Sequence, residues 1–458
     1  MELTVTDKFT GEPIGAVPWA DAPAVDAAVR RARDAFAHWR DVPAHERARV
    51  LRRAADVIEG RREAFTRTIA REAGKAWKHA AGEVARSVET FSFAAEEAKR
   101  LHGETIPMDA SASGEGRIGF YLRTPVGVVA AITPFNFPLN LVAHKVGPAL
   151  AAGNTIVLKP AEETPLTAVL MAEALAEAGL PEGVLGLVHG DGPGTGEALV
   201  THPIPAKVSF TGSPPVGRRI MQVAGLKRVT LELGNNSGTI VEPDADLERA
   251  IPRCVMSAFA NAGQVCISLQ RLYVHESIAS RFLAEFVRQT NALVVGNPLD
   301  PETDVGPLIS DDAAERAEAW IRDAVSEGAK IEAGGRREGR LLWPTVLTGT
   351  RPEMAVMCQE AFAPLVSVVT YREFDDALRM LDDSPYGLQA GVYTRDLHKA
   401  FAAVRRLDVG GVMVNDTSIF RVDHMPYGGN RMSGVGREGV RFAVEEMTNL
   451  RMVVLNLE

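Results

Sequence analysis

Three cysteines and two glycine-rich segments are the parts of this 458-residue sequence that could carry chemistry. The spacing of Cys254, Cys266 and Cys358 matches no zinc site, and three cysteines in so long a chain do not form a disulfide framework. A thiolate can attack a carbonyl carbon, but most cysteines are small buried hydrophobic residues. Residue type alone therefore favours burial for each cysteine, and only a surrounding motif can identify a nucleophile.

Two glycine-rich segments could bind the phosphates of a dinucleotide. The segment 190–196 approaches the pattern G-x-G-x-x-G, but Thr195 stands in place of the third glycine, so a plain loop is favoured. The segment 210–217 follows a predicted strand and opens a predicted helix. The free N–H groups and the dipole of such a helix start suit a pyrophosphate. An ordinary helix start would show the same sequence pattern.

The elements that must position these residues follow from the hydrophobic pattern. Residues 22–101 show apolar residues at helical spacing and predict several amphipathic helices. Short apolar strands then alternate with helices, and the pattern recurs at 239–274 and 365–415. This alternation predicts an α/β fold with parallel sheets that carry helices on both faces. The first sheet is expected to contain strands at 127–132, 155–158, 186–189 and 207–210, with helices at 141–150 and 164–178.

The composition limits the classes of function. Apolar residues make up 46% of the chain and charged residues 24%, which excludes disorder, collagen and coiled coil as the main architecture. A net charge of −9 disfavours nucleic acid as a partner, because phosphates repel an acidic protein. No apolar run reaches the ~18–20 residues of a membrane helix, and the first residues show no secretory signal. We therefore expect a cytoplasmic enzyme with no metal site and no membrane partner.

Eight motifs occur in the order found in one enzyme family. The chain resembles the NAD(P)-dependent aldehyde dehydrogenase superfamily from about Asp7 to Val454, and the segment 420–426 looks most like the lactaldehyde and phosphonoacetaldehyde dehydrogenase branch. The motifs are Pro134-Phe135-Asn136-Phe137-Pro138, Lys159-Pro160-Ala161-Glu162, Phe210-Thr211-Gly212-Ser213, Leu231-Glu232-Leu233-Gly234, Asn261-Ala262-Gly263-Gln264-Val265-Cys266, Gly306-Pro307-Leu308-Ile309, Glu360-Ala361-Phe362-Ala363-Pro364 and Pro426-Tyr427-Gly428-Gly429.

The resemblance implies two doubly wound domains and a small β element. Residues 1–105 and 129–234 would form a Rossmann-like NAD-binding domain, and residues 235–425 a catalytic domain. Residues 106–128 and 437–458 would form an oligomerisation element, because the hairpin near 116–124 and the strand 452–455 would be unpaired edges in an isolated subunit. A homodimer or a homotetramer is therefore expected.

The resemblance assigns four catalytic residues. Cys266 would add to the aldehyde and form a hemithioacetal, and Asn136 would stabilise the oxyanion. Glu232 would activate water to hydrolyse the thioester; members that acylate coenzyme A look as if they lack this glutamate, so water is the favoured acceptor. Lys145 matches a family lysine near the catalytic centre, where a proton relay and a plain helix-surface lysine both remain possible.

The resemblance also implies NAD as the cofactor, with NADP as the less favoured alternative. The carboxylate of Glu162 would accept hydrogen bonds from the adenosine ribose and repel a 2′-phosphate. Glu163 is a second carboxylate next to it, which complicates the assignment of the cofactor preference to Glu162 alone. The implied cofactor-binding residues are Thr133, Phe135, Lys159, Glu162, Gly192, Gly212, Ser213, Gly217, Leu233, Glu360 and Phe362.

Two positions depart from the family pattern. Asn235 replaces the second glycine of the usual Leu-Glu-Leu-Gly-Gly stretch, and asparagine tolerates a left-handed backbone well enough to keep such a turn. Phe135 stands where many members carry tryptophan, an apolar exchange with a mild expected effect.

The substrate is expected to be a short aldehyde with a hydroxyl or acidic group. Arg421 and, secondarily, Arg86 could hold such an acid with a guanidinium fork, although either could also be a solvated surface arginine. Two other functions remain open: transfer of the acyl group to coenzyme A, and a silent scaffold that kept the fold without activity.

Overall fold

The first sheet of the molecule is parallel except at one edge. In the computed structural model, which describes residues 1–457, short β21 runs antiparallel to β9 while the other neighbours run parallel. The order of the strands across the sheet is β21 (Gly434–Val435), β9 (Arg228–Glu232), β8 (Lys207–Thr211), β5 (Val128–Ile132), β6 (Thr155–Lys159) and β7 (Leu185–Leu187).

Helices cover both faces of this sheet because its strands are apolar on both sides. Val129 and Ala131 of β5 pack into one core, whereas Val128 and Ala130 pack into another. The first core is closed by α2 (Ala44–Gly60), α3 (Arg62–Ala73), α4 (Trp77–Ala98), α5 (Asn140–Ala151), α6 (Leu166–Glu177) and α15 (Val440–Glu446). The second core is closed by α1 (Ala22–Trp39), α7 (Glu197–Thr201) and α8 (Pro214–Val223).

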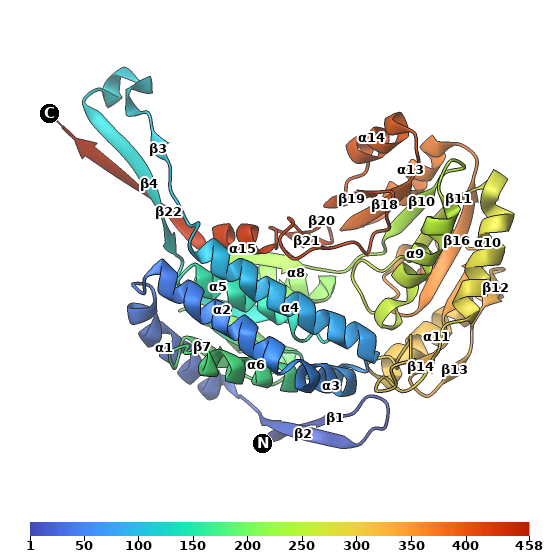
Figure 1. Cartoon of the computed structure of the whole chain (residues 1–458), viewed down its shortest axis with the longest axis horizontal. Coiled ribbons are helices and arrows are strands. Elements are labelled where there is room, and N and C mark those ends of the chain that lie inside the picture. The colour runs from blue at the N-terminus through green and yellow to red at the C-terminus, as the bar shows by residue number, and fades with distance from the viewer. Residues whose placement is uncertain (458) are drawn as a thin grey trace.

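A second sheet repeats this architecture farther along the chain (Figure 1). Its strand order is β12 (Lys330–Ala333), β15 (Thr345–Thr348), β16 (Leu365–Tyr371), β11 (Arg271–His275), β10 (Gly238–Val241), β18 (Gln389–Tyr393) and β19 (Gly411–Val414). One face carries α9 (Leu247–Phe259), α10 (Glu276–Asn291), α11 (Asp311–Ser326) and α12 (Ala355–Cys358), and the other carries α13 (Phe374–Asp382) and α14 (Leu397–Arg406). The expected fold class, two doubly wound α/β units, is confirmed.

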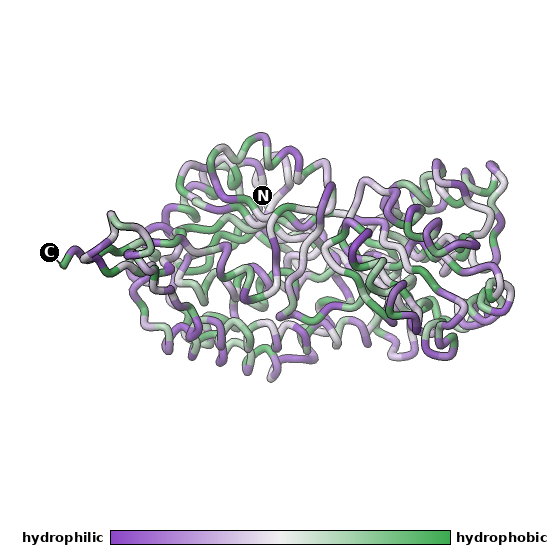
Figure 2. The backbone as a smooth tube through the Cα atoms, turned by 90° about the horizontal axis from the view of Figure 1, so that it is seen from above, coloured by the Kyte–Doolittle hydropathy of each residue, from purple (hydrophilic) through white to green (hydrophobic). Residues whose placement is uncertain are grey.

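An antiparallel arm projects from the first body and carries the C-terminal end (Figures 1 and 2). It consists of β22 (Thr448–Asn456), β4 (Arg117–Pro125) and β3 (Thr105–Ile106), in that order. The register of β22 and β4 runs from Thr448 opposite Pro125 to Asn456 opposite Arg117. Several apolar side chains of the arm are exposed, among them Ile118, Leu122, Leu450, Met452 and Val454.

The remaining elements are short. They are the β1 (Glu2–Thr6) and β2 (Pro13–Pro18) hairpin, β13 (Arg337–Glu338) with β14 (Leu341–Leu342), β17 (Tyr386–Gly387) with β20 (Asn430–Arg431), a π-helical turn at Gly192–Gly196, and 3₁₀ turns at Met108–Ala110, Ala112–Gly114 and Ala260–Gly263. The segment 426–436, which the predicted boundaries left unassigned, returns from the second body to the first sheet through β21. Within residues 1–457, no helix is long and apolar enough to cross a membrane.

Candidate active site

The segment that leads to Cys266 has a strained backbone. After α9, Asn261, Ala262 and Gly263 adopt φ values of 52°, 54° and 68°, in the left-handed region. This region costs a non-glycine residue about 1–2 kcal/mol, so it persists only where the surroundings enforce it. A Cβ on Gly263 would lie 2.0 Å from the carbonyl oxygen of Ala363, so only glycine fits there. The packed turn therefore fixes the path of the chain from the end of α9 to Cys266.

Cys266 contacts an aromatic hydroxyl. Its Sγ lies 2.9 Å from the Tyr427 hydroxyl oxygen, and the Cζ of Arg421 lies 3.6 Å from the centre of the Tyr427 ring. Burial raises the pKa of the Cys266 thiol to about 11, while the hydrogen bond with Tyr427 and the charge of Arg421 act in the opposite direction. The thiol is therefore protonated at neutral pH in this arrangement and needs a base or a further positive charge to become a nucleophile.

Asn136 faces the Cys266 segment from the loop between β5 and α5. Its Nδ2 donates to the carbonyl oxygen of Gln264 at 2.9 Å, and Asn261 donates to the carbonyl oxygens of both Asn136 and Gln264. A primary amide has two N–H donors, so one can remain on Gln264 while the other points to an oxygen bound beside the sulfur. The sequence-predicted oxyanion donor and nucleophile thus lie in one site.

Glu232, the last residue of β9, is buried without a hydrogen-bond partner. Neither of its carboxylate oxygens has one within residues 1–457. Burial and the charge of Glu438 raise its pKa well above the ordinary value, although Arg421 and Lys145 oppose this shift. A Cβ at position 428 would lie 2.9 Å from Glu232 Oε1, so Gly428 leaves room beside the carboxylate. A buried carboxylate with a high proton affinity is a strong candidate for a general base.

Lys145 is fully buried and forms an ion pair, which excludes the alternative of a helix-surface lysine. Its Nζ donates to Glu438 Oε1 at 2.7 Å and to Ser209 Oγ at 3.1 Å. Burial alone would raise the pKa of Glu438, but Lys145 and Arg421 hold it below the ordinary value. Glu438 therefore stays charged beside Glu232, and this charge helps to keep the proton affinity of Glu232 high.

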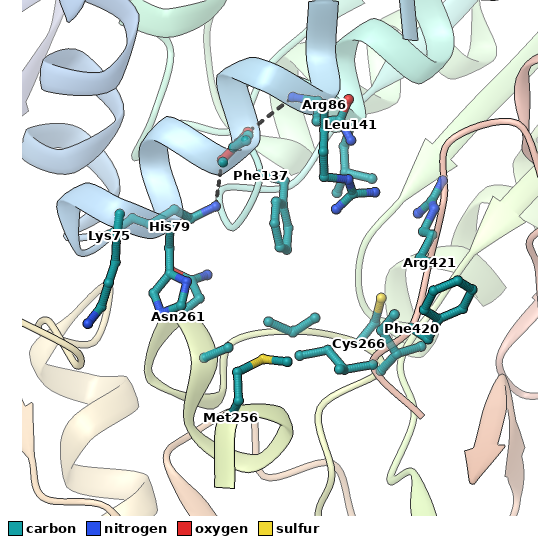
Figure 3. Close-up of a pocket in the computed structure, with 18 of the residues that line it drawn as sticks. Lys75, His79, Arg86, Phe137, Leu141, Met256, Asn261, Cys266, Phe420 and Arg421 are labelled. Carbon is teal, nitrogen blue, oxygen red and sulfur yellow. Dashed lines mark hydrogen bonds and ion pairs between the residues drawn. The ribbon is translucent and has the colours of Figure 1, made fainter. Parts of the chain in front are cut away.

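A pocket of about 340 Å³ opens beside Cys266. In Figure 3, Cys266 and Arg421 lie at one end, and Lys75 and His79 lie at the other. The pocket is rich in cations, but most of them are held by a neighbouring acid. The pairs are Lys75 with Glu83, Lys78 with Asp304, Arg86 with Asp423, and Arg253 with Asp416.

Arg421 differs from these cations because it is buried beside the sulfur with free donors. Only 7% of its side chain is exposed, so it is not a solvated surface arginine. Its Nη2 lies 3.5 Å from Glu438 Oε2, yet Nε and Nη2 have no hydrogen-bond partner in the described part of the chain. Buried polar groups normally find partners, so these N–H groups are available to an anionic ligand.

Arg86, the second predicted anchor, is already occupied by Asp423. Its Nε and Nη2 donate to the two carboxylate oxygens of Asp423 at 3.1 Å and 2.7 Å. Asp423 also accepts from Asn140 and lies 2.8 Å from His144 Nε2. Burial would raise the pKa of Asp423, but His144 and Arg86 hold it below its usual range. Arg86 therefore connects α4 to the loop that carries Arg421 and has its guanidinium fork filled.

A second cleft, of about 370 Å³, lies at the carboxyl ends of β5, β6 and β8. This edge of a parallel sheet is where nucleotides usually bind. The predicted residues that line it are Thr133, Phe135, Lys159, Glu162, Gly192, Gly212 and Ser213. The Oγ1 atoms of Thr133 and Thr211 are buried there and lack a hydrogen-bond partner within the described chain. The cleft also contains the start of α8, where the side chain of Ser213 makes no capping bond.

The charges of this cleft suit a nucleotide. Lys159 Nζ lies 3.8 Å from Glu162 Oε1, and the carboxylate of Glu162 is 41% exposed. Arg219 also lines the cleft, but Glu197 holds its guanidinium through two hydrogen bonds. The unpartnered hydroxyls, the helix start and the partly free acid together fit a dinucleotide such as NAD.

The other predicted cofactor residues, Gly217, Leu233, Glu360 and Phe362, do not line this cleft. Glu360 accepts a hydrogen bond from the Asn235 N–H at 2.9 Å, and burial raises its pKa to about 7. The rings of Phe135 and Phe362 meet edge to face with centres 5.8 Å apart. Gly217 and Leu233 act by packing: a Cβ on Gly217 would lie 2.6 Å from the Leu233 side chain, so the glycine allows α8 to approach β9.

Position 235 does not use the tolerance of asparagine for a left-handed backbone. Within residues 1–457, the non-glycine residues with positive φ are Asn261, Ala262, Phe362, Asn415 and Arg431. Asn235 is not among them, and its side-chain amide donates to Ser237 while its N–H donates to Glu360. The substitution is thus accommodated by hydrogen bonding.

Sequence reasoning missed four residues of the site. Tyr427 and Asp423 lay in segments that were already quoted for the resemblance, and Thr211 lay in the predicted helix-opening motif. Glu438 stood outside every motif, and the sequence carries no signal for it; the structure brings it to the site by pairing its backbone with that of Tyr427. Among residues 1–457 there is also no group of three or more His, Cys, Asp or Glu side chains placed to hold a metal ion.

Comparison with known proteins identifies relatives over the whole chain. The sequence model of the aldehyde dehydrogenase family matches residues 1–453. The chain is 50% identical over 456 residues to 3-sulfolactaldehyde dehydrogenase of Priestia aryabhattai, which covers 100% of this chain and 95% of the relative.

Solved structures with the same fold carry ligands. One is aldehyde dehydrogenase 21 of Physcomitrella patens in complex with its product succinate, with a TM-score of 0.98, 39% identity and coverage of 100% of this chain and 95% of that one. Another is the glyceraldehyde-3-phosphate dehydrogenase GapN of Methanocaldococcus jannaschii complexed with NADP, with a TM-score of 0.96, 38% identity and 99% coverage of each chain.

Proposed function

Because the chain belongs to the aldehyde dehydrogenase family and is an NAD(P)-dependent enzyme, we propose that it oxidises a short anionic or hydroxylated aldehyde to the carboxylic acid with NAD as hydride acceptor. The observation that carries the substrate class is Arg421, buried in the pocket of Cys266 with free N–H donors. A guanidinium in such a place binds carboxylate, sulfonate or phosphonate groups. Two similar proteins, a 3-sulfolactaldehyde dehydrogenase and an aldehyde dehydrogenase bound to succinate, support a small anionic ligand.

In the first step the sulfur of Cys266 adds to the aldehyde carbon. The thiol proton passes to the carboxylate of Glu232, which releases it to solvent before the hydrolysis step, and the carbonyl oxygen becomes an oxyanion of the hemithioacetal. The oxyanion accepts hydrogen bonds from the Asn136 amide and the backbone N–H of Cys266. Loss of one such donor typically costs about 3–4 kcal/mol of transition-state stabilisation.

The cofactor supplies the hydride acceptor when it is bound. Thr133, Thr211 and the start of α8 would hold the phosphates, and Glu162 with Lys159 the adenosine ribose. Glu360 would hold the second ribose, and Phe135 and Phe362 would pack at the nicotinamide end. Loss of hydride from the hemithioacetal carbon leaves a thioester on Cys266.

In the last step Glu232 takes a proton from water, and the resulting hydroxide attacks the thioester. The carbon–sulfur bond breaks, the carboxylic acid leaves, and Cys266 regains its proton. The fixed negative charge of Glu438 disfavours a second negative charge on Glu232 and so keeps it a strong proton acceptor. Lys145 supports this step by keeping Glu438 charged, because its Nζ donates to Glu438 and Ser209.

In this proposal each of three parts of the chain has its own role: cofactor binding, supply of the nucleophile, and assembly. The sheet at 129–234, with residues 1–105, binds the cofactor, and the unit at 235–425 supplies Cys266. The arm at 106–128 and 437–458 carries exposed apolar residues and an open strand edge at β22, which would be covered in a homodimer or homotetramer. A monomeric mass from solution scattering would exclude this assembly.

We expect Arg421→Met to reduce kcat/KM for anionic aldehydes about 10- to 100-fold, because one charge-assisted contact is worth roughly 1.5–3 kcal/mol. Neutral aldehydes should change far less. Steady-state kinetics provide the comparison, with succinic semialdehyde as the anionic substrate and with lactaldehyde and an unbranched aliphatic aldehyde as the neutral ones.

The matched control is Arg253→Met, since Arg253 lines the same pocket but is held by Asp416. This variant should keep the preference for anionic over neutral aldehydes. Equal loss on anionic and neutral substrates in the Arg421 variant would remove Arg421 as the anchor.

Glu162→Gln tests the proposed preference for NAD. Removing the negative charge beside Lys159 should raise kcat/KM for NADP relative to NAD by about ten-fold, which corresponds to roughly 1.4 kcal/mol. Initial rates with both cofactors measure the ratio. Glu163→Gln serves as control, and an unchanged ratio in the Glu162 variant would show that the selectivity lies elsewhere.

A further inference from the structure

Tyr427 is held in place through both its backbone and its ring. Its N–H donates to the carbonyl oxygen of Glu438 at 3.0 Å, and the Glu438 N–H donates back to its carbonyl oxygen at 2.6 Å. Its ring is 3% exposed and packs in a small core with Val265, Ile267 and Leu388. This support leaves the hydroxyl group little freedom to leave Cys266.

The direction of the contact depends on the state of the sulfur. A thiol can donate to the tyrosine oxygen or accept from it, and the two atoms are 2.9 Å apart. A thiolate has no proton, so once Cys266 ionises only the Tyr427 O–H can donate. The hydrogen bond to a charged acceptor is then roughly twice as strong as a neutral one.

The surroundings of the sulfur disfavour a thiolate, so a hydrogen-bond donor to the sulfur would help to stabilise it. The groups that face Cys266 are Glu232 at the end of β9, Glu360 after α12, and Tyr427 and Arg421 on the loop before β20. The two carboxylates and burial all oppose a thiolate. Arg421 lies over the Tyr427 ring, and its positive charge acts with the hydroxyl to favour a thiolate.

We propose that Tyr427 is a catalytic residue whose hydroxyl donates a hydrogen bond to the Cys266 sulfur and stabilises the thiolate that attacks the aldehyde. This role rests on the proposed function, because it requires Cys266 to be the nucleophile. It adds a donor to the site that is separate from the Asn136 amide, which acts on the substrate oxygen.

The test is the pH dependence of Cys266 alkylation by iodoacetamide in Tyr427→Phe, which removes one oxygen atom. A Cys358→Ala background removes the other partly exposed thiol, and peptide mass spectrometry measures labelling at Cys266. The midpoint should move up by about one pH unit, so that labelling below the midpoint slows about ten-fold. kcat/KM should fall by a similar factor at low pH and recover as the pH rises.

Tyr393→Phe is the matched control, since Tyr393 is also buried at 4% exposure and its hydroxyl has no hydrogen-bond partner in the described chain. It should leave the alkylation profile unchanged, and the thermal unfolding midpoints of both variants show whether folding is affected. An unshifted profile in Tyr427→Phe, or a uniform loss at every pH, would overturn the proposal. If Cys266→Ala kept its activity, the proposed function itself would fail instead.

Discussion

Cys266→Ala should lose turnover by about 10⁴-fold or more, the size of loss seen when another enzyme class is deprived of its covalent nucleophile. Without the sulfur there is no hemithioacetal to donate a hydride, and no thioester to hydrolyse. Binding of the cofactor should be nearly unaffected, because the cleft at β5, β6 and β8 does not include Cys266. Stopped-flow detection of reduced nicotinamide and a binding titration with NAD measure the two properties separately.

Cys358→Ala is the control for this variant, since Cys358 is also partly exposed but is the last residue of α12, with its Sγ near the Glu353 carbonyl oxygen. Its turnover should stay within about two-fold of the parent enzyme, as for most substitutions away from an active site. If Cys266→Ala retained turnover while the Cys358 variant lost it, the nucleophile would have been assigned to the wrong thiol.

Glu232→Gln should slow steady-state turnover by about 10²- to 10⁴-fold, the usual contribution of a general base. The substitution keeps the shape of the side chain, so substrate and cofactor should still bind. Because hydrolysis is the step most affected, an acyl group should accumulate on Cys266 and be visible as added mass on that peptide. Glu242→Gln, a buried carboxylate that contacts Tyr371 and Lys399, is the matched control.

The pH dependence follows from the directions of the pKa shifts. Glu232 and Cys266 both act in their deprotonated forms, and burial raises the pKa of each. A raised pKa means that the active form is lost as the pH falls toward neutrality, so kcat of the parent enzyme should rise with pH on the alkaline side. In Glu232→Gln the part of this rise that reports hydrolysis should disappear. An unchanged profile would exclude Glu232 as the base.

The fold was predictable because its signals are local. The apolar run at 127–132 predicts a buried strand, and the structure places that strand at Val128–Ile132. The helix predicted at 141–150 runs from Asn140 to Ala151. Each of these elements is hydrophobic over its own length, so no distant residue is needed to recognise it.

The interactions inside the site were not predictable in the same way. Tyr427 meets Cys266 across 161 residues of sequence, and Lys145 meets Glu438 across 293. The motifs predicted a nucleophile, a base and an oxyanion donor, but they could not show that Asp423 fills the fork of Arg86 or that Glu438 raises the proton affinity of Glu232. Such contacts depend on how separate loops pack, which a local pattern does not encode.

The central claim is that a short anionic or hydroxylated aldehyde is converted to its free acid by water. The most direct measurement is the amount of carboxylic acid and of reduced nicotinamide formed in the absence of coenzyme A, across lactaldehyde, succinic semialdehyde, phosphonoacetaldehyde, glycolaldehyde and a neutral aliphatic aldehyde. One acid per reduced cofactor, with the highest kcat/KM on the anionic members, is the predicted result. Product that forms only as an acyl-CoA, turnover that is best with the neutral aldehyde, or no turnover with NAD or NADP would contradict it.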